Sequence, residues 1–310
     1  MKKNIISMAV VLFSLLSGNT EAQQKYDNFY KAMREKDSTA LERILYEIRS
    51  GNDHSAERYI AEYNYWVNRA HISEGPVLST ELPEGEGISG IYTLTDSNGN
   101  VSGYMYGLDY YDPQLTDTAI AVISEGIMRY PDRLDMRFGK IHLLGESGRW
   151  QPYTEEILST LDRNKANEKA WVYPDVTESM DTVLIYSVLD YEKKILNSIS
   201  DFKTPTAQDS LMFLCIRRIA QGMLQQYPKD VFSLNMMAAT YHCMNQADSA
   251  LIWLLKAEKA NPKDALVLLN IADAYYRMGD RKKDKAYLKK AKKYGNEEIK
   301  EAVRYRLQNN

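Results

Sequence analysis

The 310-residue sequence holds few of the side chains that usually carry catalytic or metal chemistry. It has two cysteines and four histidines, and none of the patterns Cys-x-x-Cys, His-x-x-x-His or His-Glu-x-x-His. Gly-x-Ser-x-Gly, phosphate-loop and dinucleotide-binding patterns are missing as well. The chain therefore has no local motif of a zinc peptidase, a serine hydrolase or a nucleotide-binding enzyme. We expect a protein that is not an enzyme and that has no cofactor and no metal site.

Long hydrophobic runs are also missing, apart from one near the N-terminus. Lys2 and Lys3 precede an apolar stretch at 5–16, and a small-residue cleavage site follows at 20–22. This stretch is too short to cross a bilayer, which takes about 20 apolar residues. We expect a signal peptide over residues 1–22, cleaved after Ala22, and a mature chain that is periplasmic or secreted and has no membrane span.

Neither sign of charge dominates the composition, but the two signs are unevenly distributed. From Lys256 onward there are 15 Lys/Arg and 8 Asp/Glu, a net charge of +7, which leaves −11 on residues 23–255. One explanation is a solvated outer face on the last helices. The other is a basic end that meets an acidic partner or an anionic envelope surface. An exported protein has little occasion to meet nucleic acid, so we expect no nucleic-acid partner.

One pattern occurs twice between residues 231 and 298, at an offset of 34 residues. Its members are Leu234, Met237, Ala238, Tyr241, Ala250, Leu254, Ala257 and Pro262 in the first copy, and Leu268, Ile271, Ala272, Tyr275, Leu288 and Ala291 in the second. This pattern resembles the tetratricopeptide repeat (TPR), a helix–turn–helix unit in which small residues mark the helix contacts. The second copy departs from the pattern at Asp284, where a small residue is expected, and at Asn296.

The resemblance implies an all-α fold, a right-handed α-solenoid of about six helical hairpins. Clear repeats are expected at 231–264 and 265–298, with a capping helix at 297–307. Weaker signals upstream predict N-terminal hairpins within 23–167 and C-terminal hairpins within 168–310. A last repeat can lose inward packing because nothing stacks beyond it, which would explain Asp284.

The second hairpin is interrupted by an insertion at residues 70–114. Six glycines and prolines between residues 73 and 90 predict a loop there. Two strand-like runs at 91–95 and 101–106 flank Asn98 and Gly99, a pair typical of a type I′ turn, and so predict a β-hairpin. We expect residues 88–111 to pack across the first helices of the solenoid and to form one wall of a binding surface.

In TPR proteins, ligands commonly lie against positions 2, 5, 9, 12 and 13 of each first helix. Aromatic side chains on such a surface are good anchors, because they bury apolar area and keep a polar tip. The resemblance, together with the insertion, predicts these partner-binding residues: Tyr59, Tyr63, Trp66, Tyr104, Tyr106, Asn235, His242, Asp273, Tyr276 and Arg277. The alternative for the first three is that they pack beneath the insertion.

These residues lead to the hypothesis of an exported, non-enzymatic TPR-like scaffold that binds a protein or peptide partner in the cell envelope. The alternative is a glycan-binding accessory protein of nutrient capture, which the tyrosine-rich insertion would suit.

Two further points stay open in the sequence. Cys215 and Cys243 either form a disulfide or are unpaired buried thiols. Five motifs of Asp, then Ser or Thr, then an apolar residue or Thr either cap helices or accept O-glycans; they start at Asp37, Asp117, Asp181, Asp209 and Asp248.

Overall fold

The computed structural model describes residues 21–51, 53–84, 87–174, 176–202 and 204–308. Most of the expected signal peptide, residues 1–20, lies outside these ranges. The described chain has thirteen helices and three strands. It forms two compact units, one of residues 1–149 with 170–177 and the other of 150–169 with 178–310. The helix at 150–166 therefore groups with the C-terminal half, whereas we expected a division after residue 167.

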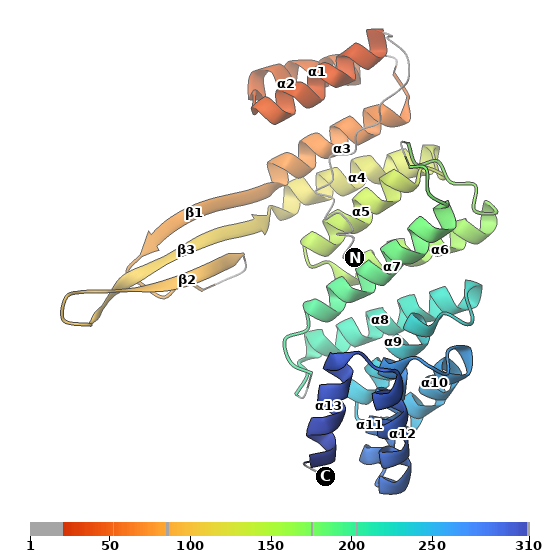
Figure 1. Ribbon diagram of the computed structural model, residues 1–310. Coiled ribbons are helices and arrows are strands. Elements are labelled where there is room, and N and C mark those ends of the chain that lie inside the picture. Colours follow the sequence, from red (N-terminus) through yellow and green to blue (C-terminus); the bar gives the residue numbers. More distant parts are fainter. Residues whose placement is uncertain (1–20, 52, 85–86, 175, 203, 309–310) are drawn as a thin grey trace. The chain divides into compact units, whose positions relative to one another are not determined.

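The first unit consists of five helices and one small sheet (Figure 1). Its elements are α1 (Glu21–Glu35), α2 (Ser38–Ser50), α3 (Ala56–Ala70), β1 (His71–Ser79), β2 (Ile88–Thr95), β3 (Val101–Tyr111), α4 (Pro113–Arg129) and α5 (Leu134–Glu146).

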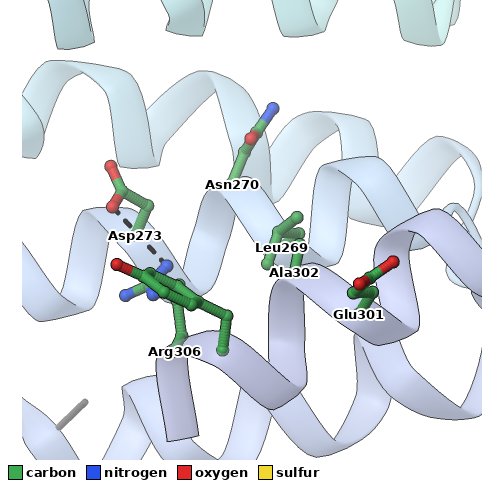
Figure 2. Close-up of a pocket in the computed structure, with 7 residues that line it drawn as sticks. Leu269, Asn270, Asp273, Glu301, Ala302 and Arg306 are labelled. Carbon is green, nitrogen blue, oxygen red and sulfur yellow. Dashed lines mark ion pairs between the residues drawn. The ribbon is translucent and has the colours of Figure 1, made fainter. Parts of the chain in front are cut away.

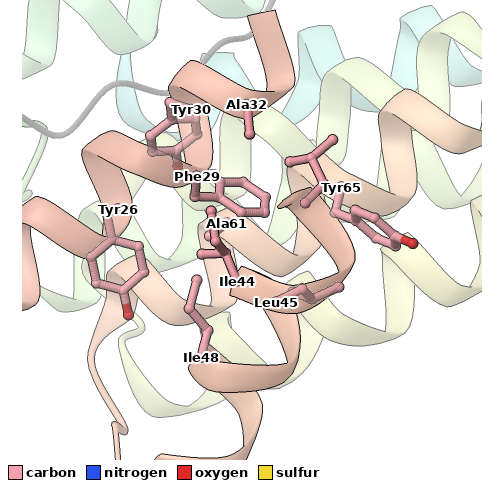
Figure 3. Close-up of a cluster of buried hydrophobic side chains, with 10 residues drawn as sticks. Tyr26, Phe29, Tyr30, Ala32, Ile44, Leu45, Ile48, Ala61 and Tyr65 are labelled. Atoms are coloured by element: carbon pink, nitrogen blue, oxygen red, sulfur yellow. The ribbon is translucent and has the colours of Figure 1, made fainter. Parts of the chain in front are cut away.

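Helices α1, α2 and α3 share one apolar core, shown in Figure 3. Phe29 and Ile48 are fully buried in it, and α3 contributes the small side chain of Ala61. The hydroxyl group of Tyr30, whose ring is buried in this core, has a hydrogen-bond partner: Asn64 Nδ2 donates to Tyr30 Oη at 3.4 Å.

Helices α3 and α4 approach each other closely at Gly126. A β-carbon at this position would lie 2.8 Å from Cβ of Tyr59 and 3.3 Å from Sδ of Met136, closer than side chains normally come. Gly126 occupies a repeat position at which TPR helices need a small residue, so the same constraint operates in the second hairpin as in the C-terminal repeats.

The insertion is a three-stranded antiparallel sheet in the order β1-β3-β2. Strand β1 continues directly from α3, and β3 leads into α4 (Figure 1). The predicted loop between residues 73 and 90 was wrong at both ends, because β1 extends to Ser79 and β2 begins at Ile88. Gly75 and Pro76 favour a loop in the sequence, but in the structure they lie within β1. The pairing with β3 is irregular between Glu74 and Val77, and a strand tolerates proline at such a point.

The hairpin of β2 and β3 has the expected register, with Tyr92 opposite Met105 and Thr93 opposite Tyr104. Its turn differs from the expected type I′. Gly99 has a positive φ of 82°, but Asn98 is not among the residues with positive φ. The amide of Asn100 donates to the Asp96 side chain at 2.9 Å, and Asp96 N donates to Asn100 O at 2.8 Å. This is a three-residue loop that ends in a left-handed glycine.

The expectation that residues 88–111 pack across the first helices was also wrong. Tyr111, at the base of the sheet, packs against the core of α3 and α4. Farther along the strands, apolar side chains are exposed: Ile91 by 47%, Tyr92 by 62% and Val101 by 57%. A β-strand extends more than twice as far per residue as a helix, so the strands soon leave the helix ends behind.

The second unit is entirely helical in its described residues. Its elements are α6 (Trp150–Ala166), α7 (Met180–Asn197), α8 (Ala207–Gln226), α9 (Val231–Cys243), α10 (Ala247–Ala260), α11 (Ala265–Arg277), α12 (Arg281–Tyr294) and α13 (Glu297–Gln308). None of the helices in the described ranges is both long enough and apolar enough to cross a membrane.

The bounds of these helices repeat with the sequence pattern. Helix α9 spans residues 231–243 and α11 spans 265–277, a shift of 34 residues at both ends. Helix α10 spans 247–260 and α12 spans 281–294, with the same shift. The small residues Ala250 and Ala257 are fully buried between the helices. The fold is therefore an all-α array of helix pairs with a β insertion, as the sequence predicts.

Aspartates mark many of the helix starts. Asp230, Asp264 and Asp280 each accept a hydrogen bond from the amide three residues on, at the starts of α9, α11 and α12. Of the Asp-Ser/Thr motifs, Asp37 caps α2 in this way, and Asp209 completes the capping box of α8. The other three aspartates lie inside helices, so capping explains two of the five motifs.

The buried alanines of α10 give a direct test of the repeat register. We expect Ala257→Glu or Ala250→Glu to lower the free energy of unfolding by about 3 kcal/mol or more, because each change buries a charge where two helices touch. Ile252→Glu is the matched control on the same helix, since Ile252 is 58% exposed. Thermal or urea unfolding that does not distinguish the alanine variants from Ile252→Glu would show that the register is wrong.

Candidate functional site

The predicted aromatic stripe of α3 is part of the core. Tyr59 and Tyr63 are each 1% exposed and belong to the cluster formed with α4 and α5. The Tyr63 hydroxyl donates to the carbonyl oxygen of Gly139 at 2.6 Å. Burial raises the pKa of Tyr63 far above its ordinary range. Trp66 packs on the edge of this cluster, with the Arg49 guanidinium 5.5 Å from its ring centre. Our assignment of Tyr59 and Tyr63 to a binding surface was therefore wrong, because α5 covers them.

Tyr104 and Tyr106 lie on the sheet and are half-buried. They share one face of β3, because side chains alternate along a strand. Tyr106 lines an open pocket of about 700 Å³ on this face. The structure does not bring these two tyrosines together with Tyr59 and Tyr63.

The predicted residues of the second unit, in contrast, form one connected group. Asn235 and His242 lie on α9, and Asp273, Tyr276 and Arg277 lie on α11. His242 Nδ1 is 3.2 Å from Asp273 Oδ2, and Arg277 Nε donates to the same oxygen at 2.7 Å. Asn270 Nδ2 donates to Asn235 Oδ1 at 2.8 Å, which links the two first helices a second time.

Asp273 is the electrostatic centre of this group. Its burial opposes ionisation, but the hydrogen bonds of His242 and Arg277 outweigh that effect and lower its pKa to about 2, from an ordinary 3.8. The carboxylate is therefore charged at every physiological pH and holds the surrounding cations in place.

The capping helix α13 adds a residue that our sequence analysis missed. Arg306 lies 3.5 Å from Asp273 Oδ1 and 3.2 Å from Asp284 Oδ1. Two guanidinium groups lie near the ring of Tyr276, with Arg281 at 3.7 Å and Arg306 at 5.1 Å from its centre. These contacts connect α11, α12 and α13.

The Arg306 contact explains why Asp284 departs from the repeat pattern. The Asp284 side chain is fully buried, and burial raises its pKa, although Arg306 opposes the rise. We had attributed this departure to an unstacked last repeat, but α13 covers the site and supplies a basic partner. The signal for this contact in the sequence is an aspartate at a small-residue position, followed by a capping helix that contains arginine.

A pocket opens beside this group, between α11 and α13 (Figure 2). Its volume is about 510 Å³. Figure 2 shows Asp273 and Arg306 joined by their ion pair on one side and Glu301 on the other. The lining residues are Leu269, Asn270, Asp273, Glu301, Ala302, Tyr305 and Arg306. The pocket thus combines apolar side chains with an amide and charges of both signs.

Further reactive groups are the thiols of the two cysteines. Cys215 and Cys243 are free thiols, and burial raises the pKa of both. The disulfide that the sequence left open is therefore not formed. No group of three or more His, Cys, Asp or Glu side chains suited to a metal ion occurs in the part of the chain that the structure describes.

Comparisons with known proteins found only distant similarities. No family model and no curated protein sequence matches the chain. Among solved structures, a tetratricopeptide repeat protein from Parabacteroides merdae is 12% identical, with a TM-score of 0.28, and the match covers 91% of this chain and 98% of that one. The feature that the chain shares with TPR proteins is the helix-pair repeat of 34 residues in α9–α12.

Two further solved structures are similar at the same level. The TPR2AB domain of yeast Sti1 in complex with an HSP90 peptide is 11% identical, with a TM-score of 0.26 and coverage of 89% and 92%. The human IFIT1 dimer with m7Gppp-AAAA is 10% identical, with a TM-score of 0.23, and the match covers 85% of this chain and 58% of that one. Since all three TM-scores are below 0.5, the TPR-like assignment rests on the 34-residue repeat of α9–α12.

The ion pair of α13 predicts a specific pattern of variant stabilities. Arg306→Leu leaves the Asp284 carboxylate buried without its cation, so we expect a loss of about 2–3 kcal/mol. Asp284→Ala restores the small residue of the repeat, so the double variant should recover most of that loss, with a coupling of about 1.5 kcal/mol or more. Arg304→Leu, which removes an exposed pair with Glu297, is the control. Equal urea-unfolding energies for Arg306→Leu and Arg304→Leu would contradict this role.

The lowered pKa of Asp273 predicts a dependence of stability on acid. Because the folded pKa lies below the unfolded value, the charged carboxylate stabilises the fold above about pH 4, and this contribution is lost as the pH falls towards 2. Asp273→Asn should therefore destabilise the protein near pH 6 and have progressively less effect below pH 4. Urea unfolding of both proteins across this range is the measurement. A difference between them that does not change with pH would contradict the assignment.

Proposed function

We propose that the protein is an exported, non-enzymatic TPR-like scaffold that binds a protein or peptide partner in the cell envelope. The contact surface consists of the first helices α9 and α11 together with α13. In the first unit the predicted aromatic anchors Tyr59 and Tyr63 are core residues, so the second unit carries this function.

The observation that carries the proposal is the composition of the α11–α13 pocket. Leu269 and Ala302 offer apolar area for a side chain, and Asn270 offers an amide that can donate to or accept from a peptide backbone. Tyr305 is 69% exposed beside them and provides a large ring with a polar tip. A few polar groups around an apolar floor are typical of a site that orients a ligand by its backbone.

The network behind the pocket supports the proposal further. Asp273 is held by His242 and Arg277, and Arg306 is held by Asp273 and Asp284. These side chains are fixed before any partner arrives, so binding does not have to order them, and preorganisation of this kind favours affinity. Glycan binding stays an alternative prediction.

Export is the second part of the proposal, and its support is the pattern of residues 1–22. We expect the mature protein to begin at Gln23. Mass spectrometry of the protein recovered from the producing cells tests this point: a chain that keeps residues 1–22 would contradict the expected export.

Partner binding is tested with a matched pair of substitutions on α11. Leu269 lines the pocket, whereas Leu266 is 50% exposed on the same helix and is not among the lining residues. We expect Leu269→Glu to abolish capture of the partner from an envelope extract, and Leu266→Glu, with the same change in charge, to leave it intact.

A second pair checks the result without adding charge. Tyr305→Ala should weaken capture by about tenfold or more, whereas Tyr294→Ala on α12 should not. Thermal unfolding establishes that all four variants are folded. Equal capture by the pocket variants and their controls, or turnover of a substrate by the pure protein, would contradict the proposal.

A further inference from the structure

The sheet of β1, β2 and β3 exposes large apolar side chains on strands that extend beyond the helices. Leu78 is 69% exposed and Tyr92 62%. Tyr92 lies opposite Met105 on β3, and Leu78 pairs with Met105 from the other side, so the three side chains form one apolar row across the sheet. A small sheet is stabilised when one of its faces is covered, so this row indicates a surface that a partner covers.

The opposite face of the sheet carries a pocket. Residues 79 and 81–84, at the end of β1 and just after it, line an open pocket of about 700 Å³ together with residues of β2 and β3. Ile88, Tyr106 and Leu108 give it apolar area, and Glu81 and Glu84 add two carboxylates to its lining. An aromatic ring beside two carboxylates attracts a cation, because both the ring face and the carboxylates are negative.

The charge of the whole insertion has one sign. Residues 71–112 contain seven Asp/Glu and no Lys or Arg. Three of these carboxylates have local roles, but in the ranges that the structure describes neither Glu81 nor Glu84 has a basic partner. Those with local roles are Asp96 in the β2–β3 turn, Asp109 beside His71, and Asp112 at the start of α4. A basic partner complements this surface.

The two outer strands of the sheet differ in what they offer. Strand β1 contains Pro76, which protects an edge because proline has no backbone N–H to donate. Strand β2 runs from Ile88 to Thr95 and contains no charged residue and no proline. Both strands have irregularities in their pairing with β3, and that of β2 is regular from Tyr92 to Leu94. Ile88 also lines the pocket, so the open edge and the pocket adjoin.

We propose that the sheet is a docking surface for an extended, cationic segment of a partner protein, which adds as a fourth strand beside β2. Side chains of a strand alternate between the two faces. Lysine or arginine side chains of the segment then point to the pocket with Glu81 and Glu84, and apolar side chains lie beside Tyr92. This assigns a second surface and goes beyond the function proposed above, because it holds whether or not the α11–α13 pocket binds a partner.

The test uses the full mature chain and labelled octapeptides with alternating sequence. A peptide of alternating lysine and valine should bind, as followed by fluorescence anisotropy, and one of alternating glutamate and valine should not. Binding of the lysine peptide should weaken as salt is added. Equal binding of both peptides, or no binding of the lysine peptide up to about 1 mM, would overturn the proposal.

Substitutions then locate the binding site. Glu81→Gln combined with Glu84→Gln should weaken binding of the lysine peptide by about tenfold or more. The control is Glu297→Gln combined with Glu298→Gln on α13, which removes two exposed carboxylates that do not line the α11–α13 pocket. Loss of binding in the control, with retention in the first pair, would place the peptide at α13 and overturn the proposal.

Methylated peptides test the strand pairing without altering the protein. A strand added to an edge uses the N–H groups of alternate residues only. Of two peptides, one N-methylated at every lysine and the other at every valine, one should lose about tenfold or more in affinity and the other should bind as before. Unchanged binding of both would overturn the proposed strand addition.

Discussion

The close approach of paired helices at small side chains is the constraint on which the rest of the structure depends. In α10, Ala250 and Ala257 are fully buried where the helices touch, and between α3 and α4 Gly126 leaves no room for a β-carbon. Larger side chains such as Leu254 and Leu268 fill the remaining space. Packing of this density fixes the spacing of the helices, and with it the face that each first helix presents.

Two additions to the paired helices supply the surfaces that we assign to binding, and they are stabilised differently. Helix α13 is fixed by Arg306, which pairs with the buried Asp284 and with Asp273. The sheet has apolar side chains on exposed strands, a single sign of charge and one open edge. The first arrangement provides a preorganised pocket, and the second provides an edge and a charged face for an extended segment.

The parts of the structure that could be predicted from the sequence are those in which a pattern of residues repeats at a fixed spacing. Helices α9 to α12 follow the 34-residue pattern at every bound, because each position in a repeat meets the same neighbours. Repeat positions also placed His242, Asp273 and Arg277 on first-helix surfaces, where they lie on α9 and α11. Which of these groups would bond to one another required the structure.

The errors came where a contact depends on elements outside the repeat. Tyr59 and Tyr63 occupy positions that face a ligand in other repeats, but α5 covers them here. Strand β1 contains Gly75 and Pro76, which predict a loop unless the pairing with β3 is known. Arg306 reaches Asp284 across 22 residues, and no periodic pattern connects the two.

The division between a helical core and an added sheet is tested most directly by amide hydrogen exchange. His71 and Tyr111 face each other at the base of the sheet, so a short glycine-rich turn can replace residues 72–110 between them. If the small-residue contacts hold the helices, the amides of α3 and α4 will exchange as slowly in this variant as in the whole protein. Fast exchange throughout α3 and α4 would contradict this and would show that the sheet is part of what holds the first unit together.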